Sequence, residues 1–249
     1  MSSYALPAGL WRREAMAEIT RSRRMPQFLV PTVVTPGAFY ALFALALNRS
    51  SPEAATVMLA GYGVFAATGP ALFGFGAGVA MEREQGLIEL KRVSPMPAGA
   101  YVAAKLAAAM FTTALAMALI DTTALIAGVH LSILGWVELT AISLASTLPF
   151  ALLGFGLGMR MSGKGAVAAA NALYLGSAIL GGLWIPSSML PGWMRTIGQC
   201  VPSYHLNKLA QAVVNPALGS SSPSHAAIVA GMTVALGIWA WTGWRRSAA

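Results

Sequence analysis

The chain has 249 residues, of which 57% are hydrophobic and 10% are charged, and its net charge is +8 at pH 7. Soluble domains carry about 25% charged residues, so this composition excludes an ordinary soluble domain and indicates an all-α integral membrane protein. The basic residues stand at the ends of apolar stretches, which excludes a continuous nucleic-acid-binding stripe. The single cysteine, Cys200, excludes an internal disulfide and a multi-cysteine metal site.

Residues 1–27 are predicted to form a cytoplasmic amphipathic segment with five arginines before the first apolar stretch. An interfacial helix and a solvated basic tail explain this pattern equally well. About 20 apolar residues cross a bilayer, and we expect residues 28–249 to form one transmembrane domain of six helices. The predicted spans are residues 28–47, 54–80, 101–129, 137–159, 166–185 and 226–244.

The distribution of lysine and arginine predicts the orientation of these spans. One side carries thirteen of the sixteen, in residues 8–27, 82–105, 160–164 and 245–246, whereas the other side carries Arg49, Arg195 and Lys208. Because short loops rich in lysine and arginine stay in the cytoplasm, we expect a multi-pass protein of the plasma (inner) membrane with both termini cytoplasmic.

A charged stretch separates the second and third predicted spans. Residues 82–92 hold three of the eight acidic residues and three of the sixteen basic ones. A charge at the bilayer centre costs about 2.5 kcal/mol or more, so this stretch is expected in water. Its spacing predicts a short amphipathic helix on the membrane surface that ends at Pro95 and Pro97. An ordinary charged loop is the alternative.

The same stretch resembles the hallmark segment of the membrane subunits of type-2 ABC exporters, Glu-Arg-Glu-x-Gly-Thr-Leu-Glu-x-Leu followed by a proline and a lysine. The sequence departs mildly at Leu87, where the family has threonine, and at Ile88. The matching residues are Glu82, Arg83, Glu84, Gly86, Glu89, Leu90, Pro95 and Lys105. In that family the segment is the coupling helix, so the resemblance implies that the first six of these residues contact a cytoplasmic ATPase.

Asp121 is the one acidic residue well inside a predicted span. It lies sixteen residues beyond Lys105, which is about 24 Å along a helix and places it toward the outer leaflet. An ionisable residue in a membrane is a candidate for the translocation path. Structural hydrogen bonding near the external water is the other explanation.

Residues 158–165 almost match a phosphate-binding loop but lack the final hydroxyl, because Gly165 occupies that position. We therefore expect no cofactor on this chain, and we expect ATP and magnesium on a separate ATPase. No catalytic motif and no metal-ligand spacing is evident, which indicates a transport subunit rather than an enzyme. An intramembrane enzyme and a non-transporting scaffold are the alternatives from other classes.

Small residues recur at helical spacing in several spans and allow helix backbones to approach closely. In the resembling family the first and fifth spans line a dimer interface, so Ala168, Ala172 and Gly176 are predicted to contact a second copy or a paralogue. Packing within one chain explains many such patterns, including Gly74 with Gly78 and Gly154 with Gly158.

The external segment of residues 186–224 is too apolar for a solvated loop, and its prolines divide it into pieces too short to span. We predict a short re-entrant helical hairpin before the sixth span, with Trp193, Met194 and Tyr204 as candidates for a gate. A packed cap without a substrate role is equally consistent with the pattern.

Together these features resemble a permease that works with an ATPase dimer among membrane lipids. The resemblance implies ATP-driven export of a hydrophobic or amphipathic drug or natural product. Export of a lipid-linked glycan or polysaccharide is the alternative within the family.

Overall fold

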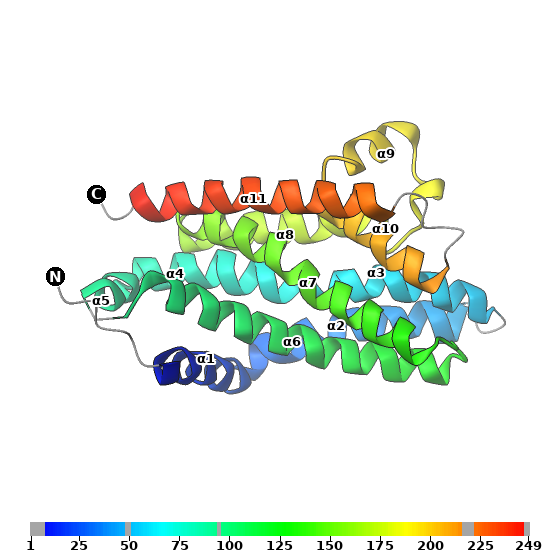
Figure 1. Ribbon diagram of the computed structural model, residues 1–249, viewed down its shortest axis with the longest axis horizontal. Helices are drawn as coiled ribbons and strands as arrows, with labels where there is room; N and C mark the ends of the chain where they lie inside the picture. Colours follow the sequence, from blue (N-terminus) through cyan, green and yellow to red (C-terminus); the bar gives the residue numbers. More distant parts are fainter. Residues whose placement is uncertain (1–7, 48–50, 94–95, 216–221, 247–249) are drawn as a thin grey trace.

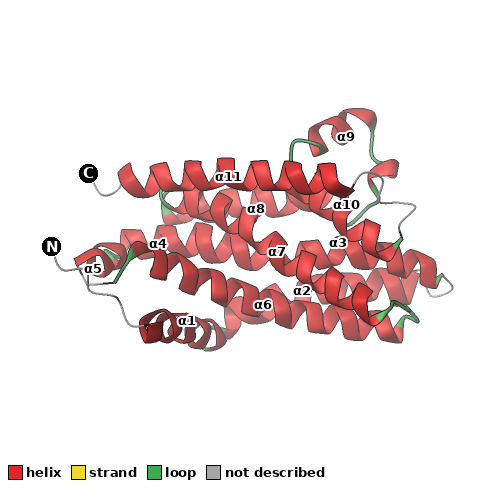
Figure 2. Cartoon of the chain, viewed as in Figure 1, coloured by secondary structure: helices red, strands yellow, loops and turns green. Residues whose placement is uncertain are grey.

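The computed structural model describes residues 8–47, 51–93, 96–215 and 222–246, which form helices joined by short connections (Figures 1 and 2). No strand occurs among these residues. The elements are α1 (Ala8–Arg23), α2 (Pro26–Ala41), the π-helical η1 (Leu42–Leu47), α3 (Pro52–Ala71), the π-helical η2 (Leu72–Ala77), α4 (Gly78–Glu84), α5 (Leu87–Val93), α6 (Ala98–Ile126), α7 (Ile133–Gly158), α8 (Gly163–Leu180), the 3₁₀ turn η3 (Ser187–Met189), α9 (Gly192–Gly198), α10 (Pro202–Val214) and α11 (Ser222–Arg246).

Five helices in the described part of the chain are long and apolar enough to cross a membrane. They are Pro26–Ala46, Pro52–Glu84, Gly99–Ile126, Ile133–Gly158 and Pro223–Arg246. They agree with five of the six predicted spans, although the second continues beyond the predicted end at residue 80. The remaining predicted span corresponds to α8, which has 18 residues and is not among the five. The total of six spans therefore stays a prediction.

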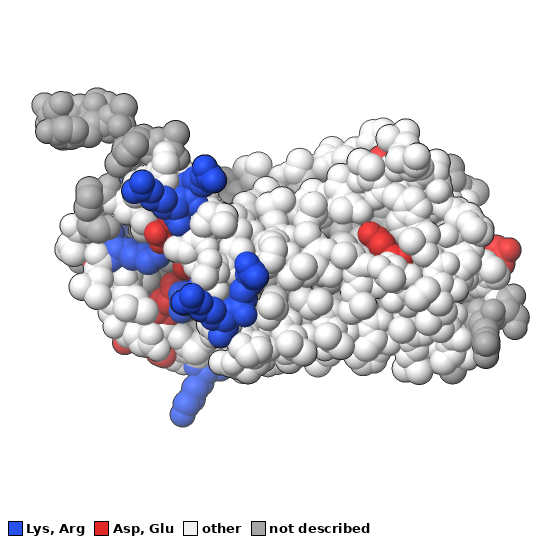
Figure 3. All heavy atoms as spheres, turned by 90° about the horizontal axis from the view of Figure 1, so that it is seen from below, with Lys and Arg blue, Asp and Glu red and all other residues white. Residues whose placement is uncertain are grey.

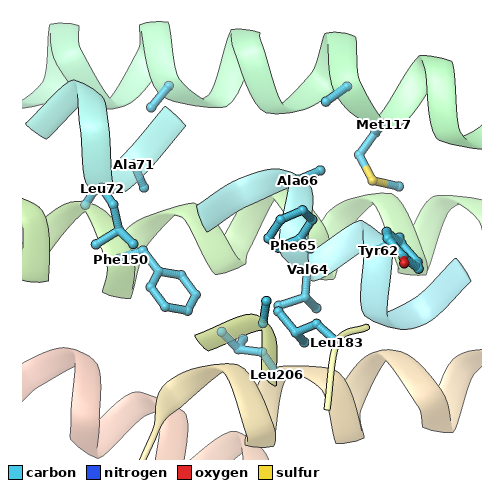
Figure 4. Packing of buried hydrophobic residues seen from close by; sticks show 14 of the residues in the cluster. Tyr62, Val64, Phe65, Ala66, Ala71, Leu72, Met117, Phe150, Leu183 and Leu206 are labelled. Atoms are coloured by element: carbon cyan, nitrogen blue, oxygen red, sulfur yellow. The ribbon is translucent and has the colours of Figure 1, made fainter. Parts of the chain in front are cut away.

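The central helix α3 is surrounded by its neighbours. Every residue from Leu59 to Leu72 is buried, and Phe65 of α3, Leu72 of η2 and Phe150 of α7 are among the largest buried side chains of the protein (Figure 4). A helix that is apolar on all sides belongs in the middle of a bundle. The other helices of the bundle therefore pack around α3 rather than against one face of it.

The glycine pair of α7 packs against η2 inside the chain. A Cβ atom on Gly154 would lie 3.0 Å from the carbonyl oxygen of Ala71, and one on Gly158 would lie 2.7 Å from that of Phe75. Only glycine permits these backbones to approach so closely. For this pair, packing within one chain is confirmed. Gly74, by contrast, has no neighbouring helix within 4 Å of its Cβ position.

Helix α8 ends early, and α10 occupies the space beyond its end. The side-chain amide of Asn207 on α10 donates to the carbonyl oxygens of Gly181 and Gly182 at 3.0 and 2.8 Å. These bonds satisfy backbone acceptors at the end of α8, which would otherwise be unpaired. The predicted external hairpin thus consists of two different parts: α9 projects from the bundle, whereas α10 packs within it against α3, α7 and α11 (Figure 1).

Candidate functional site

On the face shown in Figure 3 the lysines and arginines gather at one end of the bundle, called here the charged end. This end is formed by α1, α4, α5, the start of α6 and the C-terminal end of α11 (Figure 1). The predicted coupling stretch lies here, and its first three residues, Glu82, Arg83 and Glu84, are called the charged triplet. Glu82 bonds to α1 and α6, whereas Arg83 and Glu84 bond to the start of α8 and the connection before it.

The Glu82 side chain is only 4% exposed and is fully engaged inside the protein. Lys105 Nζ donates to its Oε1 at 2.9 Å, the Tyr101 hydroxyl donates to its Oε2 at 2.7 Å, and the Arg21 guanidinium also donates to Oε1. Glu18 Oε1 lies 3.7 Å from Lys105 Nζ and 3.5 Å from Arg21 Nη1. Two acids and two bases thus join α1, α4 and α6.

The charge balance of this network explains how it tolerates burial. A buried ion is costly unless opposite charges and hydrogen bonds compensate it. Burial alone would lower the pKa of Arg21, but the hydrogen bond and the charge of Glu82 raise it above its ordinary value. Arg21 therefore stays charged, and the network has two positive and two negative members.

Arg83 and Glu84 bind the connection that precedes α8. Arg83 Nη2 donates to the carbonyl oxygen of Met161 at 2.7 Å, and Glu84 Oε1 accepts from the backbone N–H of Gly163 at 2.9 Å. Gly163 is the first residue of α8, so the Glu84 carboxylate also meets the positive end of the helix dipole. Through these two residues α4 is joined to the start of α8.

The chain turns after the charged triplet instead of continuing as one helix. Gly86 has φ +71°, a left-handed conformation that glycine adopts without steric cost. The prediction of a single amphipathic helix through residues 82–92 is therefore wrong: the triplet completes the second span, and α5 begins at Leu87. The predicted stop at Pro95 lies outside the described residues, and Pro97 is the N-cap of α6.

Helix α5 is held by one face and exposes the other. Ile88 is buried, and Lys91 Nζ bonds to Glu14 Oε1 on α1 at 2.5 Å. On the opposite face Leu90 is 64% exposed and Val93 is 85% exposed, and Glu89 is also exposed. Of the six predicted partner contacts, Glu84, Glu89 and Leu90 are accessible, whereas the Glu82 carboxylate is enclosed.

The predicted dimer residues lie on an open face of α8. Ala168 and Ala172 are exposed. Gly176 has no neighbouring side chain or helix within 4 Å of its Cβ position. Asn171 is exposed on the same face. The structure thus brings these residues into one accessible stripe.

The four predicted path residues are spread over three helices. Asp121 on α6 is half-buried, and its Oδ1 atom is buried without a hydrogen-bond partner in the described part of the chain. Trp193 on α9 is 64% exposed. Met194, also on α9, and Tyr204 on α10 are half-buried.

A row of five aromatic rings connects the half of the bundle near the charged end to the opposite half. The ring centroids of Phe73 and Tyr174 are 5.7 Å apart, those of Tyr174 and Phe65 are 4.6 Å apart, those of Phe65 and Trp184 are 5.2 Å apart, and those of Trp184 and Phe39 are 5.3 Å apart. Phe39 is 37% exposed, and Phe73, Tyr174 and Trp184 are half-buried. Sequence reasoning missed this row, because its members are far apart in the chain and share no spacing.

Two histidines meet at the end opposite the charged end. Their Nδ1 atoms, on His205 of α10 and His225 of α11, lie 2.8 Å apart, and His205 Nε2 lies 2.9 Å from the carbonyl oxygen of Gln199. Because a carbonyl oxygen can only accept, His205 carries a proton on Nε2. No group of three potential metal ligands occurs among the described residues. The pair thus joins α10 to α11.

The sequence model of the ABC-2 type transporter family matches residues 10–214. The chain belongs to the ABC-2 type transporter family. A Bacillus subtilis (strain 168) protein named as a transport permease, YvfS, is 29% identical over 207 residues, which cover 82% of this chain and 84% of that protein.

As an ABC-2 permease, the chain is a multi-pass membrane component of an ABC transporter rather than an enzyme. Permeases of this family normally work with a cytoplasmic ATPase. The matched region contains the charged triplet, α5 and the open face of α8. The site described above therefore lies within the part of the chain that defines the family.

Proposed function

We propose that this chain is the permease subunit of an ATP-driven exporter that moves a hydrophobic or amphipathic small molecule out of the cytoplasm or the inner leaflet. The observation that carries the proposal is the arrangement around α5. This helix presents exposed apolar side chains outward, while its other face and the adjoining charged triplet are bonded to α1, α6 and the start of α8. A movement of α5 would therefore reach three helices at once.

The outer face of α5 suits a protein partner. Leu87, Leu90 and Val93 recur every three residues and are 36%, 64% and 85% exposed. Exposed apolar side chains grouped in this way mark interaction sites. In our proposal they enter a groove on the ATPase, Glu84 and Glu89 lie at the rim, and Glu82 transmits the movement to α1 and α6.

The remaining parts of the proposal follow from the charge distribution and the open faces. From the positive-inside tendency we expect the charged end and both termini in the cytoplasm, with the protein in the plasma membrane. The open stripe of Ala168, Ala172 and Gly176 would pack against a second copy or a paralogue. ATP and magnesium would bind to the ATPase dimer, and membrane lipids would surround the permease.

We assign the aromatic row to the translocation path. Four of its five rings, all except that of the buried Phe65, are at least partly exposed, and none of them is charged, which suits a hydrophobic substrate. At the outer end Trp193, Met194 and Tyr204 would form the gate. Asp121, with its buried Oδ1 atom, is the polar residue that we assign to the outer half of the path.

The test is a matched pair of substitutions in the co-expressed permease–ATPase complex. Leu90 and Leu134 are equally exposed, 64% each, but lie at opposite ends of the bundle. Leu90→Ala should weaken ATPase binding by about tenfold, which corresponds to about 1.4 kcal/mol, and should lower permease-dependent ATP hydrolysis. Leu134→Ala should leave both unchanged. Full ATPase binding and coupling in a Leu90→Ala, Val93→Ala double variant would exclude α5 as the contact.

A further inference from the structure

The charged end contains a cavity beside the ionic network of Glu82. It has a volume of about 320 Å³ and lies between α1, α2, the η2–α4 segment and α6. Small-molecule pockets typically measure 300–1,000 Å³, so this space is large enough for a ligand. One part of its wall is apolar, with Met25, Phe28, Phe73 and Met81, and the other part contains the buried ionic network.

Within the ionic network of the polar wall, Arg21 is the side chain most open to a ligand. The side chains of Glu82, Lys105 and Glu18 are 4%, 8% and 10% exposed, whereas that of Arg21 is 48% exposed. Arg21 meets both carboxylates through Nη1 alone, and a guanidinium has five N–H donors. A ligand group that enters the polar part of the cavity therefore finds Arg21 with donors to spare.

The net positive charge of α1 also favours an acidic ligand in this cavity. Helix α1 carries Arg12, Arg13, Arg21 and Arg23 against only Glu14 and Glu18. Such an excess raises the local concentration of anions near the cavity. The guanidinium geometry matches a carboxylate or a phosphate, which it binds with two parallel hydrogen bonds.

We propose that this cavity binds an acidic amphiphile. Its carboxylate or phosphate accepts hydrogen bonds from Arg21, and its apolar body lies against Phe28 and Phe73. Phe73 is also the first ring of the aromatic row, so the bound molecule contacts the beginning of that row. The assignment of such molecules as the transported class rests on the proposed function, but binding to the cavity does not.

The binding test uses three probes with the same hydrocarbon chain: oleate, oleyl alcohol and oleylamine. Native mass spectrometry of the purified permease, without ATPase, measures the affinity of each. Wild-type protein should bind oleate about tenfold more tightly than the alcohol, a difference of about 1.4 kcal/mol, and should bind the amine most weakly. Arg21→Gln should remove the preference for oleate, whereas Arg23→Gln, which removes a charge from the same helix, should retain it.

A second variant fills the cavity without altering its charges. Gly74 lines the cavity, and no neighbouring helix lies within 4 Å of its Cβ position, so a Gly74→Phe side chain has room to enter the space. Oleate binding should fall by about tenfold or more. Gly231 on α11 is equally open but lies away from the cavity, so Gly231→Phe should bind oleate as the wild type does.

Equal binding of oleate and oleyl alcohol would overturn the proposal, as would normal oleate binding by Gly74→Phe. If binding fails while Leu90→Ala still uncouples the ATPase, the proposed function stands without this site. If oleate binds as expected, ATP-driven movement of oleate in proteoliposomes identifies a transported molecule. The other outcome is a preference for phosphatidylglycerol over phosphatidylcholine that is lost in Gly74→Phe and does not change with ATP. This result identifies the ligand as a resident acidic lipid. Both latter results support the site.

Discussion

Removal of the Glu82 carboxylate should destabilise the charged end more than any other single change to the charged stretch. In Glu82→Ala, Lys105 loses the carboxylate at 2.9 Å and keeps only Glu18 at 3.7 Å, although the lysine side chain is 8% exposed. Breaking a buried pair costs about 3–5 kcal/mol. Arg21 contributes less to this loss, because its half-exposed guanidinium regains water.

We therefore expect the free energy of unfolding to fall by about 3 kcal/mol in Glu82→Ala, which corresponds to a fall in Tm of roughly 6–12 °C for a chain of this size. Tryptophan fluorescence during heating of the detergent-solubilised permease provides the measurement, since the chain has seven tryptophans. Glu89→Ala is the matched control, because this carboxylate is exposed on α5 and its loss should change Tm little.

A double variant tests whether the unpaired charge of Lys105 causes this loss of stability. Replacing both members of the pair, as in Glu82→Ala with Lys105→Met, leaves no unpaired charge at this position and should restore at least half of the stability lost in Glu82→Ala. Two results would refute the argument: a Glu82→Ala protein as stable as the wild type, or a double variant whose loss equals the sum of the two single losses.

Three further changes are informative. Gly86→Ala should cost about 1–2 kcal/mol, since the residue at φ +71° would acquire a Cβ atom, and a Tm equal to that of the wild type would show that the turn can rearrange. Gly176→Leu should weaken self-association in a crosslinking assay, because it adds bulk to the open face of α8; an unchanged dimer would place the interface elsewhere. Cys200 is exposed, so a membrane-impermeant thiol reagent added outside intact cells should label it. Labelling only from the cytoplasm would contradict the predicted topology.

The sequence was sufficient to locate the charged stretch, but not to assign the directions of its side chains. Glu82 was placed between two spans by its charged neighbours, and the structure puts it at the end of the second span. Its partner Arg21 is 61 residues away, and the partners of Arg83 and Glu84 are 78 and 79 residues away. Such contacts depend on how the helices pack, and no local spacing encodes them.

Local chemistry explains which boundaries were correct and which were not. Apolar runs predicted five long helices within a few residues, because the bilayer requires a minimum length. The predicted fifth span was placed at residues 166–185, whereas α8 ends at Leu180, where Gly181 and Gly182 follow and Asn207 caps the helix. The break at Gly86 had a visible signal in the glycine itself, but the charge periodicity around it suggested an uninterrupted helix.

The shortness of α8 has a consequence for the membrane around it. Eighteen residues extend for about 27 Å, whereas the hydrocarbon layer of a bilayer is about 30 Å thick and its thickness varies with acyl chain length. The turn at residues 181–183 is buried, and the next large apolar side chains that the chain exposes beyond α8 are those of Ile185 and Met189. Lipids with longer acyl chains should then cover groups that shorter chains leave in water, and this side of the protein should respond to bilayer thickness more strongly than the side formed by α6 and α7.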